Sequence, residues 1–171
     1  MKNKQNIKWI LLITSLTFVI SMIFSYLSET ILKKSNFVIE LLVLLTVILI
    51  GIIFDMIGVA VTTCAEHPFH AMASRKIKGA KTAIKLIKNK DKVSSFCNDV
   101  IGDICGIVSG TAGVIIATSI AKDSIICSLL VTATISSLTI GGKALGKKVA
   151  VNKSENITKI VSKILSIMEH K

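Results

Sequence analysis

The sequence predicts an all-α integral membrane protein with about four transmembrane helices and two amphipathic interfacial helices. Three observations support this class. Hydrophobic residues make up 51% of the 171 residues, and the mean hydropathy of +0.72 is well above that of an ordinary soluble domain. Several apolar stretches reach the roughly 20 residues needed to cross hydrocarbon. Lysines gather in short runs beside these stretches, as the positive-inside rule describes.

The first apolar stretch, residues 8–28, follows Lys2 and Lys4. A basic start and an apolar stretch are also the pattern of a signal peptide. This stretch is longer than the usual apolar region of a signal peptide, and no A-x-A-like cleavage site follows it, so the pattern favours a retained helix. We interpret residues 1–36 as an N-terminal transmembrane helix and an outer loop.

The second stretch, residues 37–62, is the most hydrophobic in the chain and carries Asp55 towards its C-terminal end. A juxtamembrane belt rich in lysine follows at residues 66–92. Its apolar residues recur at helical spacing, which predicts an amphipathic helix whose basic face meets lipid headgroups, with Gly79 as a candidate break. The apolar stripe of the belt consists of Ile77, Ala80, Ile84 and Ile87.

The third stretch, residues 94–121, is apolar enough to span a bilayer yet carries Asn98, Asp99 and Asp103. On an ideal α-helix the two carboxylates share one face with Gly106, Gly110 and Gly113. Because unpaired charges in a span cost several kcal/mol, we expect this face to meet the interior of a helix bundle or a water-filled cavity. Gly102, Gly106 and Gly110 form two overlapping G-x-x-x-G steps.

The fourth stretch, residues 124–150, is rich in Ser, Thr and Gly and ends on Lys143, Lys147 and Lys148. Residues 151–171 then carry an apolar stripe that predicts a second interfacial helix. The four spans and the basic runs together predict a multi-pass protein of the cell (inner or plasma) membrane with both termini in the cytoplasm. Residues 37–150 form the predicted transmembrane core.

Several function classes are disfavoured. The formal net charge of +11 does not indicate nucleic acid, because the lysines flank apolar segments and aromatic residues are only 5%. No G-x-S-x-G, H-E-x-x-H or phosphate-binding glycine loop occurs, so we do not expect an enzyme. A zinc site is one reading of Cys64, Glu66, His67 and His70, but an ordinary interfacial loop fits better because no second ligand pair follows.

Three segments carry a family resemblance: KGAKTAIKLIKNKDKVSSFCN at 78–98, GGKALGKKVAVNKSEN at 141–156 and FDMIGVAVTT at 54–63. With them, residues 37 to about 165 resemble the transmembrane domain of the CNNM/CorB/CorC family of magnesium transporters, standing alone without that family's paired cytosolic nucleotide-binding (CBS) domains. The positions in register are Ala60, Ala80, Ala83, Leu86, Asn89, Asp91, Lys92, Asn98, Gly142, Lys147, Asn152 and Glu155, with Asp55 near the first serine of the family motif.

The resemblance implies three spans with a juxtamembrane belt, a homodimer, and a cation site of Ser, Asn, Glu and backbone carbonyls, with Mg²⁺ as the ion and Na⁺ as the coupling ion. The chain departs from this pattern at three places. Lys143 stands where the family has an acid, Gly146 where it has a proline, and Gly58 where it has a glutamate.

Two functional hypotheses follow. In the first, carboxylate, amide and carbonyl oxygens bind Mg²⁺, a hard cation that prefers oxygen ligands, and alternating exposure of the site moves it. In the second, Lys143 neutralises the acids, and the chain is a non-transporting membrane module or accessory subunit. Lipid binding through the basic interfacial helices is a third reading. The candidate metal ligands are Asp55, Asn98, Asp99, Asp103 and the Gly142 carbonyl.

Overall fold

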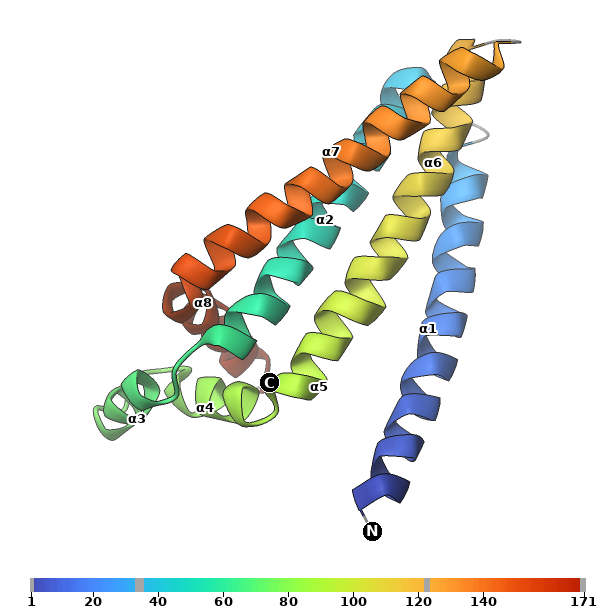
Figure 1. The fold of residues 1–171 in the computed structure, drawn as a ribbon. Helices are drawn as coiled ribbons and strands as arrows, with labels where there is room; N and C mark the ends of the chain where they lie inside the picture. The colour runs from blue at the N-terminus through green and yellow to red at the C-terminus, as the bar shows by residue number, and fades with distance from the viewer. Residues whose placement is uncertain (1, 33–35, 122–123, 170–171) are drawn as a thin grey trace. The chain divides into compact units, whose positions relative to one another are not determined.

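A computed structural model describes residues 2–32, 36–121 and 124–169, and within these ranges every regular element is a helix (Figure 1). The predicted all-helical class is therefore confirmed for the described part of the chain. The elements are α1 (Lys2–Leu32), α2 (Phe37–Thr63), α3 (His67–Ser74), α4 (Ala80–Lys88), α5 (Lys90–Ser94), the π-helix η1 (Ser95–Gly102), α6 (Asp103–Ala121), α7 (Ile125–Asn152) and α8 (Ser154–Glu169).

Four helical segments among the described residues are long and apolar enough to cross a membrane. Their number and order agree with the prediction. The third segment runs without a break through α5, η1 and α6. The segments are Trp9–Thr30, Phe37–Thr63, Lys90–Ala121 and Ile125–Asn152.

The chain divides into two compact units. The first unit consists of Met1–Gly51 and Val100–Gly141, and the second of Ile52–Asp99 and Gly142–Lys171. Helices α2 and α7 and the π-helix η1 each supply residues to both units, and each unit has its own packing.

In the first unit, α6 packs against α1 and α2. Ile104 and Val108 of α6, together with Val100 of η1, are buried against partly buried apolar side chains of α1 and α2. One close contact lies at Gly51 of α2, where an added Cβ would sit 2.9 Å from the Cβ of Cys105. Among the glycines of the third span, Gly110 has no neighbouring atom within 4 Å of an added Cβ, whereas a Cβ on Gly113 would lie 3.3 Å from the Ile135 side chain.

In the second unit, α4 packs against α3 and α8. Phe69 of α3 and Ala83 of α4 are almost fully buried in a shared core with Cys64 and Ile87. The lysines Lys81, Lys85 and Lys88 lie on the exposed side of α4, as the sequence predicted for an amphipathic helix.

The predicted belt is interrupted where Gly79 adopts the left-handed conformation, with a φ of +87°, directly before α4. The predicted stripe is wrong at its first member, because Ile77 lies outside any helix and is 42% exposed. A Cβ on Gly79 would lie 2.9 Å from the backbone of Lys163 in α8. Glycine is needed here both for its φ and for this close approach.

Candidate functional site

The second unit contains a close crossing of α2 and α7. A Cβ on Gly142 would lie 2.6 Å from the Cδ1 atom of Ile52, and a Cβ on Gly146 would lie 2.9 Å from the Cγ2 atom of the same residue. Residues four apart share a helix face, so Gly142 and Gly146 together form a G-x-x-x-G step that lets α7 approach α2. The spacing is visible in the sequence, although the packing role of Gly142 and Gly146 was not predicted from it.

The glycine step brings two ammonium groups to one carboxylate. Lys143 and Lys147 each follow one of the two glycines. The Nζ atom of Lys147 lies 3.4 Å from Oδ2 of Asp55, and the Nζ atom of Lys143 lies 4.0 Å from the same oxygen. Asp55 is buried, with only 3% of its surface exposed. The predicted pairing of Lys143 with an acid is thus present at the outer limit of an ion pair, and Lys147 makes the shorter contact.

A second polar group in this unit lies where the π-helix passes α2. The Asn98 Nδ2 group donates a hydrogen bond of 3.1 Å to the Ser94 hydroxyl oxygen, whereas its buried Oδ1 atom has no hydrogen-bond partner among the described residues. A Cβ on Gly58 would overlap that same Oδ1 atom. The amide of Asn98 therefore fills the place of any side chain at position 58.

The carboxylates Asp99 and Asp103 are both exposed, so within the described chain neither faces a packed interior, and their place in a water-filled cavity stays a prediction. A π-helix has more residues per turn than an α-helix, and η1 ends immediately before Asp103. The π-helix therefore changes the register of Asp99, whereas Asp103 begins α6 and keeps its α-helical spacing to Gly106 and Gly110. Binding of a metal by these residues stays a prediction.

Among Cys64, Glu66, His67 and His70, the residues considered as a zinc site, the structure pairs Glu66 with His70 and also with Lys88. Nε2 of His70 lies 2.9 Å from Oε1 of Glu66, and Nζ of Lys88 lies 3.8 Å from the same oxygen. Within the described ranges no cluster of three or more His, Cys, Asp or Glu side chains is placed to hold a metal ion.

Cys64 lies directly after α2 and is buried against Phe69, Ala83 and Ile87. Burial raises the pKa of the Cys64 thiol above its ordinary value of 9.0, and the nearby Glu155 carboxylate raises the pKa further. The neighbouring Thr158 and Ser154 hydroxyls act in the opposite direction. The net effect is a thiol that stays protonated at neutral pH, which is typical of a structural cysteine.

Comparisons with protein-family models, with curated proteins and with solved structures find no match to this chain. The fold itself defines the class of protein: the described residues form an all-helical chain with four helices long and apolar enough to span a membrane. The resemblance to the CNNM/CorB/CorC family stays a prediction.

Proposed function

We propose that this chain is a multi-pass membrane protein of the cell membrane that does not transport cations, and that it serves as a membrane module or accessory subunit for another membrane protein. The observation that carries this proposal is the contact of two lysines with the one buried acid at the α2–α7 crossing. Lys147 and Lys143 lie 3.4 Å and 4.0 Å from the Asp55 carboxylate.

The charges of this group oppose a divalent ion. A single carboxylate with two ammonium groups carries a net charge of about +1 at neutral pH. At an effective dielectric constant of about 20, each ammonium repels a divalent ion about 4 Å away by about 8 kcal/mol, and the one carboxylate attracts it by as much at the same distance, so the three groups together are repulsive. The donor set around Asp55 therefore does not fit Mg²⁺ as the side chains are placed.

The proposed membrane location rests on the four apolar helices and on the lysines beside them. We also propose a homodimer. Its support is the outer side of α6, where Gly110 has open space around it and the neighbouring Ile107 is 58% exposed. Small residues on an exposed face of an apolar helix favour contact with a second helix.

Mg²⁺ transport, with Na⁺ coupling implied only by the family resemblance, is the alternative function. One observation favours it: the buried Asn98 Oδ1 atom has no hydrogen-bond partner among the described residues, and such an atom is a ready oxygen ligand. The two functions differ in whether the folded protein gains stability from the ion.

The test is thermal unfolding of the purified full chain in detergent with increasing millimolar Mg²⁺, at constant ionic strength. A ligand that binds only the folded state raises Tm with its concentration. The module predicts no Mg²⁺-dependent rise, and no Mg²⁺ flux into vesicles that contain the protein. A rise in Tm that Asp55→Asn abolishes would overturn the proposal.

A matched pair of variants completes the test. Lys143→Met with Lys147→Met removes both ammonium groups beside Asp55, and Lys148→Met with Lys153→Met removes the same charge from two exposed positions elsewhere in the second unit. If the lysines are what excludes Mg²⁺, only the first pair gains a Mg²⁺-dependent Tm rise. A gain in both pairs would show that net charge, and not the site, controls the ion.

A further inference from the structure

The second unit contains a hollow whose walls are almost entirely apolar, with a volume of about 500 Å³. Phe54 and Ile57 of α2 form one side, and Val161 and Ile164 of α8 form another. Lys92 is the only charged residue in the lining. Since α2 is apolar enough to cross a membrane, this hollow adjoins a helix expected to lie in hydrocarbon.

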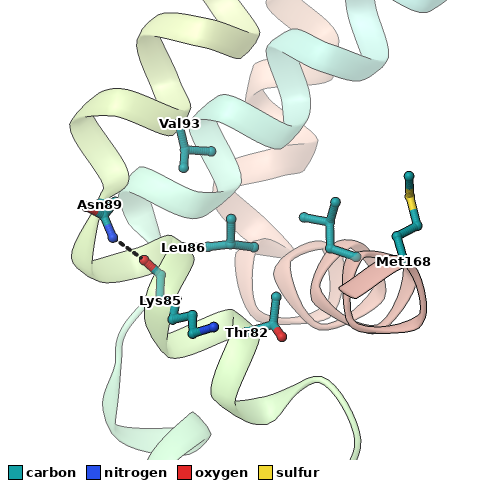
Figure 2. Close-up of a pocket in the computed structure, with 7 residues that line it drawn as sticks. Thr82, Lys85, Leu86, Asn89, Val93 and Met168 are labelled. Atoms are coloured by element: carbon teal, nitrogen blue, oxygen red, sulfur yellow. Dashed lines mark hydrogen bonds between the residues drawn. The ribbon is translucent and has the colours of Figure 1, made fainter. Parts of the chain in front are cut away.

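A second hollow of about 400 Å³ adjoins the first, since Leu86, Val93 and Leu165 line both. Figure 2 shows its lining between α4 and α8, with Thr82 and Lys85 on one side and Met168 on the other. The Asn89 Nδ2 group donates a hydrogen bond of 2.9 Å to the carbonyl oxygen of Lys85 (Figure 2). This hollow is mixed in character, with apolar and polar walls.

A third hollow of about 660 Å³ continues the series, since Thr82 and Lys85 also line it. Its other basic residues are Lys76, Lys78 and Lys81, all of them exposed. We call the three adjoining hollows together the α4–α8 groove. Along the groove the lining changes from apolar at the α2 side to four lysines at the far end.

Helix α8 buries small polar residues and exposes large apolar ones, the reverse of what is usual for a helix that packs on a protein core. Its small polar residues Thr158 and Ser162 are buried, at 0% and 1% exposure, while Ile160 and Ile167 are 59% and 63% exposed. An exposed apolar face beside a basic rim is typical of a helix that lies in the membrane interface and faces acyl chains. The groove thus opens beside a surface that is itself suited to lipid.

We propose that the α4–α8 groove binds one anionic phospholipid, with an acyl chain in the apolar hollow and the phosphate among Lys76, Lys78, Lys81 and Lys85. The charge of the rim is complementary to a phosphate, and basic pockets beside membrane helices bind anionic headgroups. An apolar hollow of this size is unfavourable in water and favourable for hydrocarbon. The proposal goes beyond the module function and does not depend on the Asp55 ion pairs.

The test uses the full chain in detergent, titrated separately with dioleoylphosphatidylglycerol, dioleoylphosphatidylcholine and inorganic phosphate. Native mass spectrometry counts the retained lipid, and Tm reports stabilisation. We expect one phosphatidylglycerol to be retained with a rise in Tm, and neither phosphatidylcholine nor phosphate to reproduce this. Equal retention of phosphatidylcholine would overturn the role of charge, and an equal Tm rise with phosphate alone would overturn the lipid in favour of a free phosphate.

Two sets of fourfold serine variants locate the site. The first replaces Lys76, Lys78, Lys81 and Lys85; the second replaces Lys90, Lys148, Lys153 and Lys159, which are exposed and lie outside the three linings. Because each lysine near an anionic headgroup contributes measurably, the first set is expected to weaken retention at least about tenfold. The second set keeps wild-type retention; an equal loss in both sets would overturn the groove as the site.

A final variant tests the apolar end without changing charge. Val161→Trp places a larger side chain in the apolar hollow, and we expect weaker retention of phosphatidylglycerol, with the four rim lysines intact. Unchanged retention in a folded Val161→Trp chain would overturn the placement of the acyl chain. The comparison of lipids on the wild-type chain stands even if this variant fails to fold.

Discussion

At the scale of single residues, this chain depends on places where a side chain is missing. The space that a side chain at position 58 would need is occupied by the amide of Asn98, and the space at position 51 is occupied by Cys105. Neither contact follows from composition or periodicity. Sequence analysis noted Gly58 as a departure from a family glutamate, and the structure supplies a physical counterpart: the space at that position is already filled.

Gly58→Ala is predicted to destabilise the protein by about 1–3 kcal/mol, the usual cost of forcing extra volume into a packed site. The added Cβ would overlap Oδ1 of Asn98. Gly141→Ala is the matched control, because nothing lies within 4 Å of an added Cβ there and alanine is the better helix former. Reversible denaturation in detergent measures both. Equal stability of the two variants would contradict the packing described for Gly58.

Cys64 offers a prediction with a pH dependence. Burial raises the pKa of its thiol, and only the thiolate reacts with iodoacetamide, so alkylation of Cys64 in the folded chain should be slow at neutral pH. Its rate should rise with pH to a midpoint above the ordinary 9.0. The neutral thiol is the form the fold favours, so any stability it contributes is lost as pH rises through the folded-state pKa.

Peptide mapping of alkylated protein by mass spectrometry checks this rate residue by residue, with the chain unfolded in denaturant as the control. The unfolded chain should react with an ordinary thiol midpoint. If folded Cys64 reacts at or below that midpoint, burial is not controlling its chemistry.

At the scale of helices, the sequence was informative about periodicity and about the break at Gly79, but not about the π-helix. The apolar stretches at residues 37–62 and 94–121 correspond to α2 and to most of the α5–η1–α6 segment, and the exposed lysines of α4 follow from its spacing. The π-helix η1 carries no sequence signature that the hydrophobic pattern reveals. Asp99 lies on this π-helix and Asp103 begins the α-helix that follows, and both are exposed.

The α2–α7 crossing provides the prediction for this scale. Gly146→Ala should lower stability by about 1–3 kcal/mol, because the new methyl group would sit 2.9 Å from Cγ2 of Ile52 and 3.0 Å from Cγ of Met56. Gly141→Ala is the control on the same helix, since nothing lies within 4 Å of an added Cβ there. Shifts in Tm compare the two, and a larger loss for Gly141→Ala would refute the crossing.

The site itself was only partly predictable from sequence. Neutralisation of an aspartate by Lys143 was one of two hypotheses, and the Lys143 Nζ atom lies 4.0 Å from Oδ2 of Asp55. Lys147 was assigned to the basic end of the fourth span and to a family position, and its contact with Asp55, the shorter one at 3.4 Å, was not predicted. The missing information was the angular register of α7, which the Gly142 and Gly146 step determines and which a charge count does not reveal.

At the scale of the whole molecule, the even number of candidate spans leads to a prediction about topology. With four membrane crossings, both termini lie on the same side, and the lysine-rich runs favour the cytoplasm. Reporter fusions that are active on only one side of the membrane, placed at the N-terminus and after residue 169, should both report the cytoplasm. Opposite results would show that one segment, with Trp9–Thr30 the first to examine, does not cross.

Gly79 has a consequence for this larger scale. The backbone of α8 lies so close to it that the spacing between α4 and α8 depends on a single hydrogen atom in place of a methyl group. Any substitution of Gly79 would move the two helices apart and widen the α4–α8 groove, while all the lysines of the groove stay in place. Under the proposed lipid binding, lipid preference would then be sensitive to an uncharged residue in the lining of the basic hollow.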